Sequence, residues 1–360
     1  PESTHGWAHE AAPEAQLPLT ASPPLRCPSL RALVKTFNDA VTIMRDSGLN
    51  TRWQALPHDA VRAVLASRAL CTDSEDSVLA LLDVWRGAND PSPAQLSALA
   101  AHIRLLQLSD GFFYNLPVTR LGPQLSPRVF GHLAARRAGA VPELAVHEDG
   151  EPLPKAWCRV AQTRPVTPLA ETRDMGDGVL RTLGLSYELT REELADGLLP
   201  EINRWEDMGD VDAEGPELFM FGMRMNLVLR VHKGTNLLEP FMCAEPVVQY
   251  VGGARGISPE YADEACDTSC LDPLWTAPPT VLTFKHRDPA DGLESTASHL
   301  ISRRTFPFTE MATSDDEDTV RFPAGESVTR LESWERLLVD GSLKLGAVVS
   351  VCREVRPDSD

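Results

Sequence analysis

Three helix-start signals follow one another between residues 56 and 116, and their spacing restricts this part of the chain to short packed helices. Pro57 opens the first helix, because proline lacks the N–H that the first turn leaves unpaired. Thr72 with Glu75 predicts a capping box for the second helix, and the pair Ser92-Pro93 opens the third. Apolar residues then recur at helical spacing and predict one buried stripe per helix: Val61, Val64 and Leu65; Val78, Leu81, Leu82 and Trp85; Leu96, Leu99, Ala100 and Ile103.

The residues before and after this stretch extend the helical array. From Ser29 to Met44 an apolar residue returns every three or four positions, which predicts one helix that ends at Gly48, with Trp53 in the next turn. A second Ser-Pro start, at 126–127, predicts a helix that closes near Gly139.

These signals assign 29–139 to an N-terminal helical domain. Residues 1–28 are rich in Pro, Ala, Glu and Ser and are expected to form a flexible arm. Residues 140–178 are Pro-rich and irregular, and we expect them to link the helical domain to the rest of the chain.

The order of these features resembles the BACK domain, the helical module that follows a BTB domain in many adaptor proteins. The residues that carry the resemblance are Leu56-Pro57, Leu70 leading into Asp73-Ser74-Glu75-Asp76, Trp85 at the end of an apolar helix, and Ile103-Arg104-Leu105 before Leu108-Ser109. The resemblance implies a substrate adaptor for a cullin-based ubiquitin ligase, in which the BTB domain binds the cullin. Residues 1–28 are too short for a BTB domain. We therefore expect a cullin scaffold as partner only together with a missing BTB domain, and no strong dimerisation.

Beyond the linker the pattern changes from helices to strands. Residues 217–231 alternate apolar and other side chains, which predicts a strand that places Phe219, Phe221, Met223, Met225, Leu227, Leu229 and Val231 on one face. A turn at 233–236 and a return strand at 237–248 follow. Further strands are predicted at 281–286, 300–308 and 343–351, and Thr190 with Glu193 forms another capping box.

This second part resembles the MATH-type β-sandwich that accompanies some BTB–BACK proteins. Residues 221–227 parallel that family's Gly-aromatic-Lys-Trp-Arg-Leu strand, with Met225 in place of the tryptophan, and 337–343 parallel its closing pattern. The expected fold class is α+β with two domains: the BACK-like helical array and, at 179–355, a MATH-like antiparallel β-sandwich. A long loop at 252–279 interrupts the sandwich.

Charge restricts the classes of partner. The chain has a formal net charge of −18; residues 1–150 hold 13 Lys/Arg against 15 Asp/Glu, which leaves 21 against 37 for the remainder. A chain this acidic repels phosphate backbones and anionic membrane surfaces. We therefore expect protein partners, and neither nucleic acid nor a membrane. No run of 18 apolar residues exists, and seven scattered cysteines do not make a disulfide framework. These features favour an intracellular, cytoplasmic location.

Candidate catalytic and cofactor sites are weak in this sequence. Cys266 and Cys270 form a C-x₃-C without the two further ligands that a zinc site needs. The glycines at 252–256 lack the spacing of a phosphate-binding loop. A metal-dependent enzyme would require His232, His286 and these cysteines to converge. We therefore assign no catalytic residue, no cofactor and no metal ligand.

The sequence thus favours a non-catalytic protein-interaction module over an enzyme. A structural subunit built permanently into a large assembly is the main alternative, because 1–28, 140–178 and 252–279 have the composition of extended arms. Candidate partner-binding residues are those expected on the outer face of the central strand or at an acidic loop tip: Arg224, Arg230, Asp315, Asp316, Glu317 and Asp318.

Overall fold

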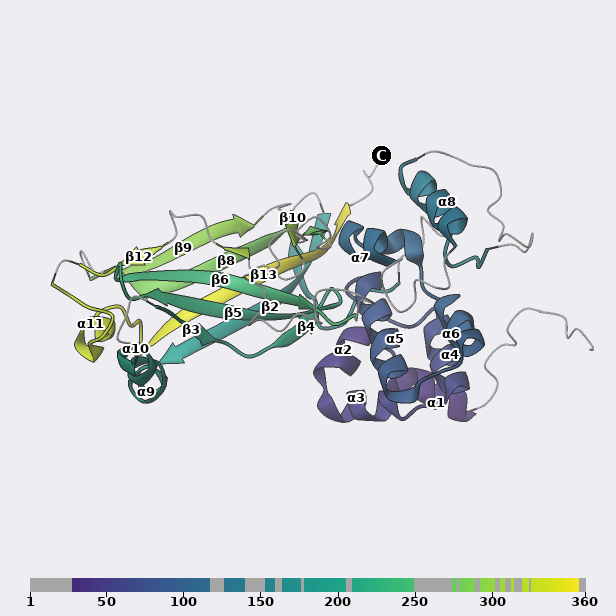
Figure 1. The fold of residues 1–360 in the computed structure, drawn as a ribbon, viewed down its shortest axis with the longest axis horizontal. Coiled ribbons are helices and arrows are strands. Elements are labelled where there is room, and N and C mark those ends of the chain that lie inside the picture. The colour runs from purple at the N-terminus through teal and green to yellow at the C-terminus, as the bar shows by residue number, and fades with distance from the viewer. Residues whose placement is uncertain are drawn as a thin grey trace, which may run out of the picture.

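A computed structural model describes residues 28–116, 126–139, 153–158, 164–175, 178–204, 209–248, 274–276, 279–288, 292–301, 305–307, 312–313, 319–323 and 325–355. The fold class is α+β: helices gather at one end of the molecule and antiparallel strands at the other (Figure 1). We call residues 28–170 the helical region and residues 171–355 the β region. Within the described ranges, no helix combines the length and the apolar character needed to cross a bilayer.

The helical region contains eight α-helices among its described residues. They are α1 (Pro28–Thr36), α2 (Ala40–Arg45), α3 (Ser47–Gln54), α4 (His58–Ala66), α5 (Glu75–Asn89), α6 (Pro93–Ala100), α7 (Asp110–Asn115) and α8 (Pro127–Arg137). A short 3-10 turn at Leu105–Gln107 lies between α6 and α7. Helix α5 is the centre of this array, since every residue from Glu75 to Asp83 is buried.

The single helix expected from Ser29 to Gly48 is wrong, because the chain breaks there into three pieces. The first piece ends at Thr36, and Asp39 caps α2 by accepting the Thr42 N–H at 3.1 Å. Asp46 caps α3 in the same way through Leu49. Trp53 lies inside α3 rather than in a turn, and its indole N–H donates to the Leu81 carbonyl at 3.0 Å. Short aspartate side chains that bond to nearby backbone N–H groups thus override the helical periodicity.

The start of α5 also differs from the prediction. Ser74, not Thr72, is the N-cap, and its hydroxyl accepts the Ser77 N–H at 3.4 Å. The expected capping box between Thr72 and Glu75 is therefore wrong, and the Glu75 carboxylate is free for another role described below. The predicted starts at Pro57, Ser92 and Ser126 are confirmed, and Trp85 is buried as expected.

The described residues of the β region form two large antiparallel sheets and a small one. The first sheet has the order β1 (Glu171–Asp174), β2 (Gly178–Thr190), β13 (Ser342–Val355), β8 (Thr280–Arg287), β9 (Glu294–Ile301). The second has the order β11 (Ala312–Thr313), β6 (Leu237–Pro246), β5 (Met223–His232), β3 (Asp210–Glu214), with β12 (Val320–Arg321) on β6 and β4 (Leu218–Met220) on β5. The small sheet pairs β7 (Leu274–Thr276) with β10 (Thr305–Pro307).

The two large sheets share one apolar core. Residues 223, 225, 227, 229 and 231 of β5 are all buried, as the alternation predicts, and β5 contacts β2 and β13 of the other sheet. From the facing sheet, Leu343, Leu345, Ala347 and Val349 enter the same core. Two short helical segments, α9 to α10 (Arg191–Arg204, with a π-helical turn at Leu194–Leu198) and α11 (Leu331–Glu335), close the end of the β region away from the helices (Figure 1). The capping box at Thr190 and Glu193 is confirmed.

The continuous strand expected at 217–231 is wrong, because it is a β-hairpin. Strand β4 pairs back onto β5, with Met220 opposite Met223. Phe221 and Gly222 form the two-residue turn between them, with φ of 53° and 74°. Positive φ at both positions is the type I′ pattern that matches the twist of the two strands. Cross-strand partners lie on the same face, so Met220 lies with Met223 and Phe219 lies with Arg224. The turn thus shifts the alternation by one position, and the face predicted for Phe219 is wrong. Because residues 219–221 are all apolar, the apolar pattern did not reveal this shift.

The segment expected as a linker contacts the helices in its described parts. The Trp157 indole N–H donates to the Ala100 carbonyl at 2.8 Å, and Val166 forms a β-bridge with Thr72. The Thr167 hydroxyl donates to Asp39 at 2.9 Å. These contacts hold residues 153–158 and 164–170 against the helices and the segments between them. The proposed division of the chain into domains stays a prediction.

Candidate functional site

The tip of the β4–β5 hairpin is the point at which the β region enters the helical region. The Phe221 N–H donates to Oδ2 of Asp73 at 2.6 Å, and the Gly222 N–H donates to Oγ of Ser77 at 2.9 Å. Asp73 and Ser77 lie at the start of α5. Two adjacent backbone donors therefore meet two side-chain acceptors from a segment about 145 residues earlier in the chain.

Glycine is required at the hairpin tip for two reasons. Its φ of +74° is unfavourable for residues with a side chain. A Cβ at Gly222 would also lie 2.8 Å from the carbonyl oxygen of Asp76 and 2.8 Å from Cζ of Phe112. The hairpin tip is therefore in direct contact with the backbone of α5 and the side chain of α7.

Arg45 of α2 makes a third contact with the hairpin. Its Nε–H donates to the carbonyl of Phe219 at 2.8 Å. Burial lowers the pKa of Arg45, and the charges of Asp73 and Asp39 oppose that shift. The hairpin is thus held by donors and acceptors from α2 and from the start of α5.

Asp73 organises the acceptors at the hairpin tip. In addition to the Phe221 N–H, its carboxylate accepts the Ser77 hydroxyl at 2.5 Å and the Ser74 N–H at 2.6 Å. The Ser77 hydroxyl thereby donates to Asp73 and accepts from Gly222. Asp73 is buried, and burial raises the pKa of its carboxyl even though these hydrogen bonds lower it.

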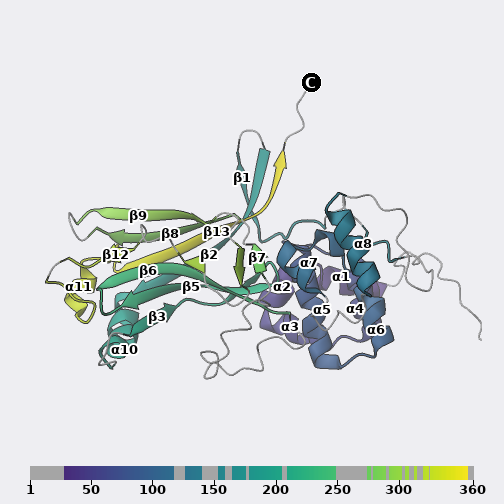
Figure 2. The same cartoon turned by 45° about the horizontal axis from the view of Figure 1, so that its top comes forward.

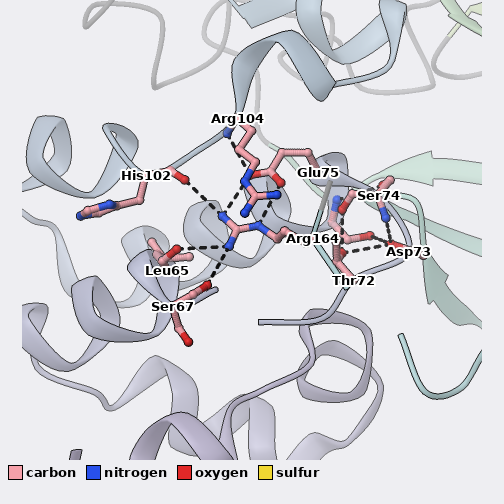
Figure 3. A network of polar contacts seen from close by, with 10 residues as sticks. Leu65, Ser67, Thr72, Asp73, Ser74, Glu75, His102, Arg104 and Arg164 are labelled. Carbon is pink, nitrogen blue, oxygen red and sulfur yellow. Dashed lines mark hydrogen bonds and ion pairs between the residues drawn. The ribbon is translucent and has the colours of Figure 1, made fainter. Parts of the chain in front are cut away.

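Glu75, two residues after Asp73, forms an ion pair with Arg164. Figure 3 shows Arg164 facing it: Nε lies 2.9 Å from Oε2 and Nη2 lies 3.2 Å from Oε1. The guanidinium also donates to the carbonyls of Leu65, Ser67 and His102. The Arg104 N–H donates to Oε1 of Glu75 at 2.9 Å. Both side chains are about 2% exposed, so this is a buried, bidentate ion pair with its remaining donors satisfied.

Asp76 completes a group of three acids within four residues. One of its carboxylate oxygens accepts the Ser109 N–H at 2.9 Å. The pKa of Asp76 is raised to about 7, chiefly by burial and also by the charge of Asp73, while hydrogen bonding to Ser109 and the charge of Arg137 act in the opposite direction. At neutral pH this carboxyl is therefore partly protonated.

The residues predicted to bind a partner lie elsewhere. Arg224 is exposed on β5, opposite Glu245 of β6. Arg230 lies on the same face but is half-buried, makes a bidentate ion pair with Asp212 at 2.9 Å, and stacks over Phe241. Asp315, Asp316, Glu317 and Asp318 lie outside the described residues.

The two histidines considered for a metal site have separate surroundings. His232 lies on β5, with Nδ1 2.9 Å from Asp210 and Nε2 2.9 Å from Glu239. His286 lies on β8 of the other large sheet, buried beside the ring of Phe284. Cys266 and Cys270 fall outside the described residues. Among the residues that are described, no three His, Cys, Asp or Glu side chains are grouped so as to hold a metal ion.

The junction itself was not predicted from the sequence. Asp73–Asp76 were noted as part of the BACK resemblance, and Gly222 was placed on the outer face of a strand. The sequence signal for this junction is the pair Phe221-Gly222 inside an alternating stretch. An isolated glycine in a strand marks a bulge, a bend or a close backbone approach.

No protein-family model matches this chain, and no curated protein sequence matches it. The structural contacts described above are therefore the basis for the functional proposals that follow.

Proposed function

We propose that this chain is a non-catalytic protein-interaction module that resembles the substrate-recognition part of a BTB–BACK adaptor. In this proposal the helices form a BACK-like domain, the two large sheets form a MATH-like sandwich, and the two domains together position a target protein. The observation that carries it is the hairpin junction. An adaptor must hold its recognition surface at a set distance and angle, and the Asp73 and Ser77 contacts to the hairpin tip support such coupling.

Arg224 is the residue of the β region that we assign to partner contact. Its side chain is exposed, whereas the charge of Arg230 is already neutralised by Asp212. An exposed arginine near acidic neighbours contributes to specificity and association rate more than to stability. The remaining acidity of the chain favours a partner with a basic surface.

The proposed location is inside the cell, in the cytoplasm. Cys71, Cys158 and Cys243 carry free thiols. Burial raises the pKa of all three, so each stays a neutral thiol at neutral pH. Free thiols are typical of a reducing compartment.

Affinity purification with the full chain tests the proposal. Wild type, Arg224→Glu and the control Arg68→Glu, an exposed arginine of the helical region, are immobilised and exposed to cell extract at about 50 mM and about 500 mM salt. We expect a protein partner that is retained by wild type and Arg68→Glu, lost with Arg224→Glu, and weakened by salt. A cullin in the retained set supports the ligase adaptor. An identical set of proteins on all three chains contradicts a role for the β region in recognition.

A second candidate function is that of a permanent structural subunit. The observation that favours it is the projecting ribbon formed by β1 and the ends of β2 and β13, which extends beyond β8 (Figure 2). Met175, which follows β1 near the tip of this ribbon, is 51% exposed. Exposed apolar residues on a projection are typical of a surface covered by a neighbour. Retention of a fixed-stoichiometry assembly at high salt, unaffected by Arg224→Glu, supports this alternative.

A further inference from the structure

Helix α8 (Pro127–Arg137) is a basic element in an acidic chain. Residues 111–142 contain four Arg and no Asp or Glu, whereas the whole chain has 52 acidic residues among 360, about one in seven. Three of these four arginines lie on α8, together with His132. The segment is therefore locally cationic, although the formal net charge of the chain is −18.

Arg137 shows how one arginine of α8 is compensated within the fold. Its Nη2 lies 2.6 Å from Oδ1 of Asp110, and its Nη1 donates to the Leu108 carbonyl at 2.6 Å. The guanidinium also lies over the ring of Phe113, 4.9 Å from the ring centre. All of these partners belong to the segments against which α8 packs. This charge is therefore used inside the helical region.

Arg128, His132 and Arg136 differ from Arg137 in this respect. They lie four positions apart, so the helical rise places them in one row about 12 Å long. Arg128 is exposed and Arg136 is half-buried. Within the ranges that the structure describes, neither arginine side chain forms a hydrogen bond or an ion pair, and the buried Nε2 of His132 has no hydrogen-bond partner. We call these three residues the basic row.

The opposite face of α8 fixes the helix in place. Val129 and Leu133 are buried, and Phe130 stacks on Phe113 with ring centres 5.3 Å apart. The Ser126 hydroxyl caps the helix by accepting the Val129 N–H at 3.3 Å. Figures 1 and 2 both show α8 on the outer side of the helical region. The basic row thus lies on a helix that is already formed and packed, so a partner does not have to order it.

The described segments around α8 supply no acid to the basic row. The carboxylate of Asp110 is engaged by Arg137. Residues 153–158, which bring Cys158 close to Arg136, hold Lys155 and no acid. The positive charge of the row is therefore available to a partner.

We propose that the basic row of α8 binds a short acidic segment of a protein partner. A guanidinium forms bidentate hydrogen bonds with a carboxylate, and the row is about as long as four residues of an extended chain. A nucleic acid would extend past the row over the acidic remainder of the chain, which repels its phosphates. The inference goes beyond the adaptor function proposed above and does not depend on it.

Fluorescence anisotropy on the full chain tests the inference. The probe is a labelled peptide of about six glutamates, titrated at about 50 mM and about 500 mM salt. We expect wild type to bind the peptide at low salt and to release it at high salt. In the double variant Arg128→Glu with Arg136→Glu, the dissociation constant at low salt should rise at least about tenfold, because both attractive charges are reversed.

Two controls separate the basic row from the net charge and from the β region. Arg68→Glu with Arg173→Glu makes the same change of charge at exposed arginines outside α8, and should stay within about threefold of wild type. Arg224→Glu should bind the peptide like wild type. If the α8 double variant does not fold, as judged by circular dichroism, Arg128→Gln with Arg136→Gln takes its place and should weaken binding at least about threefold.

The outcomes that contradict the inference are distinct. Absence of binding by wild type at low salt, equal binding by wild type and the α8 variants, or an equal loss in the Arg68 and Arg173 control overturns it. An oligothymidylate of about six phosphates is tested in parallel. If it binds more tightly than the peptide and is lost in the α8 variants, the row belongs to a nucleic-acid site and the inference is also overturned.

Discussion

The neighbouring acids at the start of α5 differ in how their charges are compensated. On the side facing the helical region, Glu75 is paired with Arg164 and every donor of the guanidinium has an assigned acceptor nearby. Asp73 accepts the Phe221 N–H of the β region and Asp76 accepts the Ser109 N–H of the helical region, and neither has an ion pair in the described structure. The ion pair of Glu75 with Arg164 stabilises the packing within the helical region. On the unpaired side, Asp73 contacts the β region without a cation.

The largest effect is expected when the paired side is broken. Arg164→Met leaves Glu75 as a buried charge without its cation and should lower the free energy of unfolding by about 3–5 kcal/mol, measured by chemical denaturation. The matched control is Arg191→Met, which breaks an exposed ion pair with Glu335 and should cost at most about 1 kcal/mol. Equal losses in the two variants would remove the distinction drawn here between buried and exposed pairs.

The unpaired side should be detected in the pH dependence of stability. The pKa of Asp76 is about 7 in the folded state, above its unfolded value, so the stability it contributes is fully present at low pH and is lost as the pH rises through about 7. The difference in unfolding free energy between wild type and Asp76→Asn should change by on the order of 3 kcal/mol from about pH 4 to about pH 7.5. A difference that does not vary with pH would mean that Asp76 is compensated after all.

A steric change at the same contact should have a smaller effect. In Gly222→Ala the new methyl group meets the Asp76 carbonyl at 2.8 Å and the backbone keeps an unfavourable φ, so we expect a loss of about 2–3 kcal/mol. Gly131→Ala, in α8, meets no atom within 4 Å and should be stabilising by about 0.5–1 kcal/mol. Thermal unfolding measures both. A neutral Gly222→Ala would show that the hairpin tip is not closely seated.

The smallest effect concerns Arg45, the cation nearest the unpaired side. Arg45→Met removes the bond to the Phe219 carbonyl and the charge near Asp73, and should cost about 1–2 kcal/mol. Arg31→Met, an exposed residue of α1, is the control and should lie within about 0.5 kcal/mol of wild type. Because the loss of the Arg45 charge disfavours ionised Asp73, the pH dependence of Arg45→Met should be steeper than that of wild type.

The difference between the two sides also explains what the sequence could predict. Caps at Ser92, Ser126 and Thr190 depend on residues three positions apart, and all three were predicted. At the start of α5, Thr72 and Ser74 both offer a hydroxyl cap; Ser74 is the cap, and the Glu75 carboxylate that a capping box at Thr72 would use binds Arg164 instead. That partner lies 89 residues later, beyond the reach of a local pattern.

The hairpin tip was missed for the same reason. The turn shifts the alternation by one position, but residues 219–221 are all apolar, so 217–231 read as one strand. The contact of Phe221 with Asp73 joins positions 148 residues apart, and neither residue has a pattern that indicates the other. The α+β class was predictable from periodicity because it depends on local repeats. The contact between the hairpin tip and the start of α5 depends instead on segments that are far apart in the sequence.

The order of strands in the five-stranded sheet has a consequence for biosynthesis. Its central strand, β13 (Ser342–Val355), is made after the strands on both sides of it, β2 and β8. On a translating ribosome the helices can pack as soon as they emerge, whereas β2 and β8 must wait with open edges until residues 342–355 leave the exit tunnel. A nascent chain stalled before Ser342 would hold two separate ladders instead of one sheet. Chaperones that shield exposed strand edges are therefore expected to bind this protein late in its synthesis.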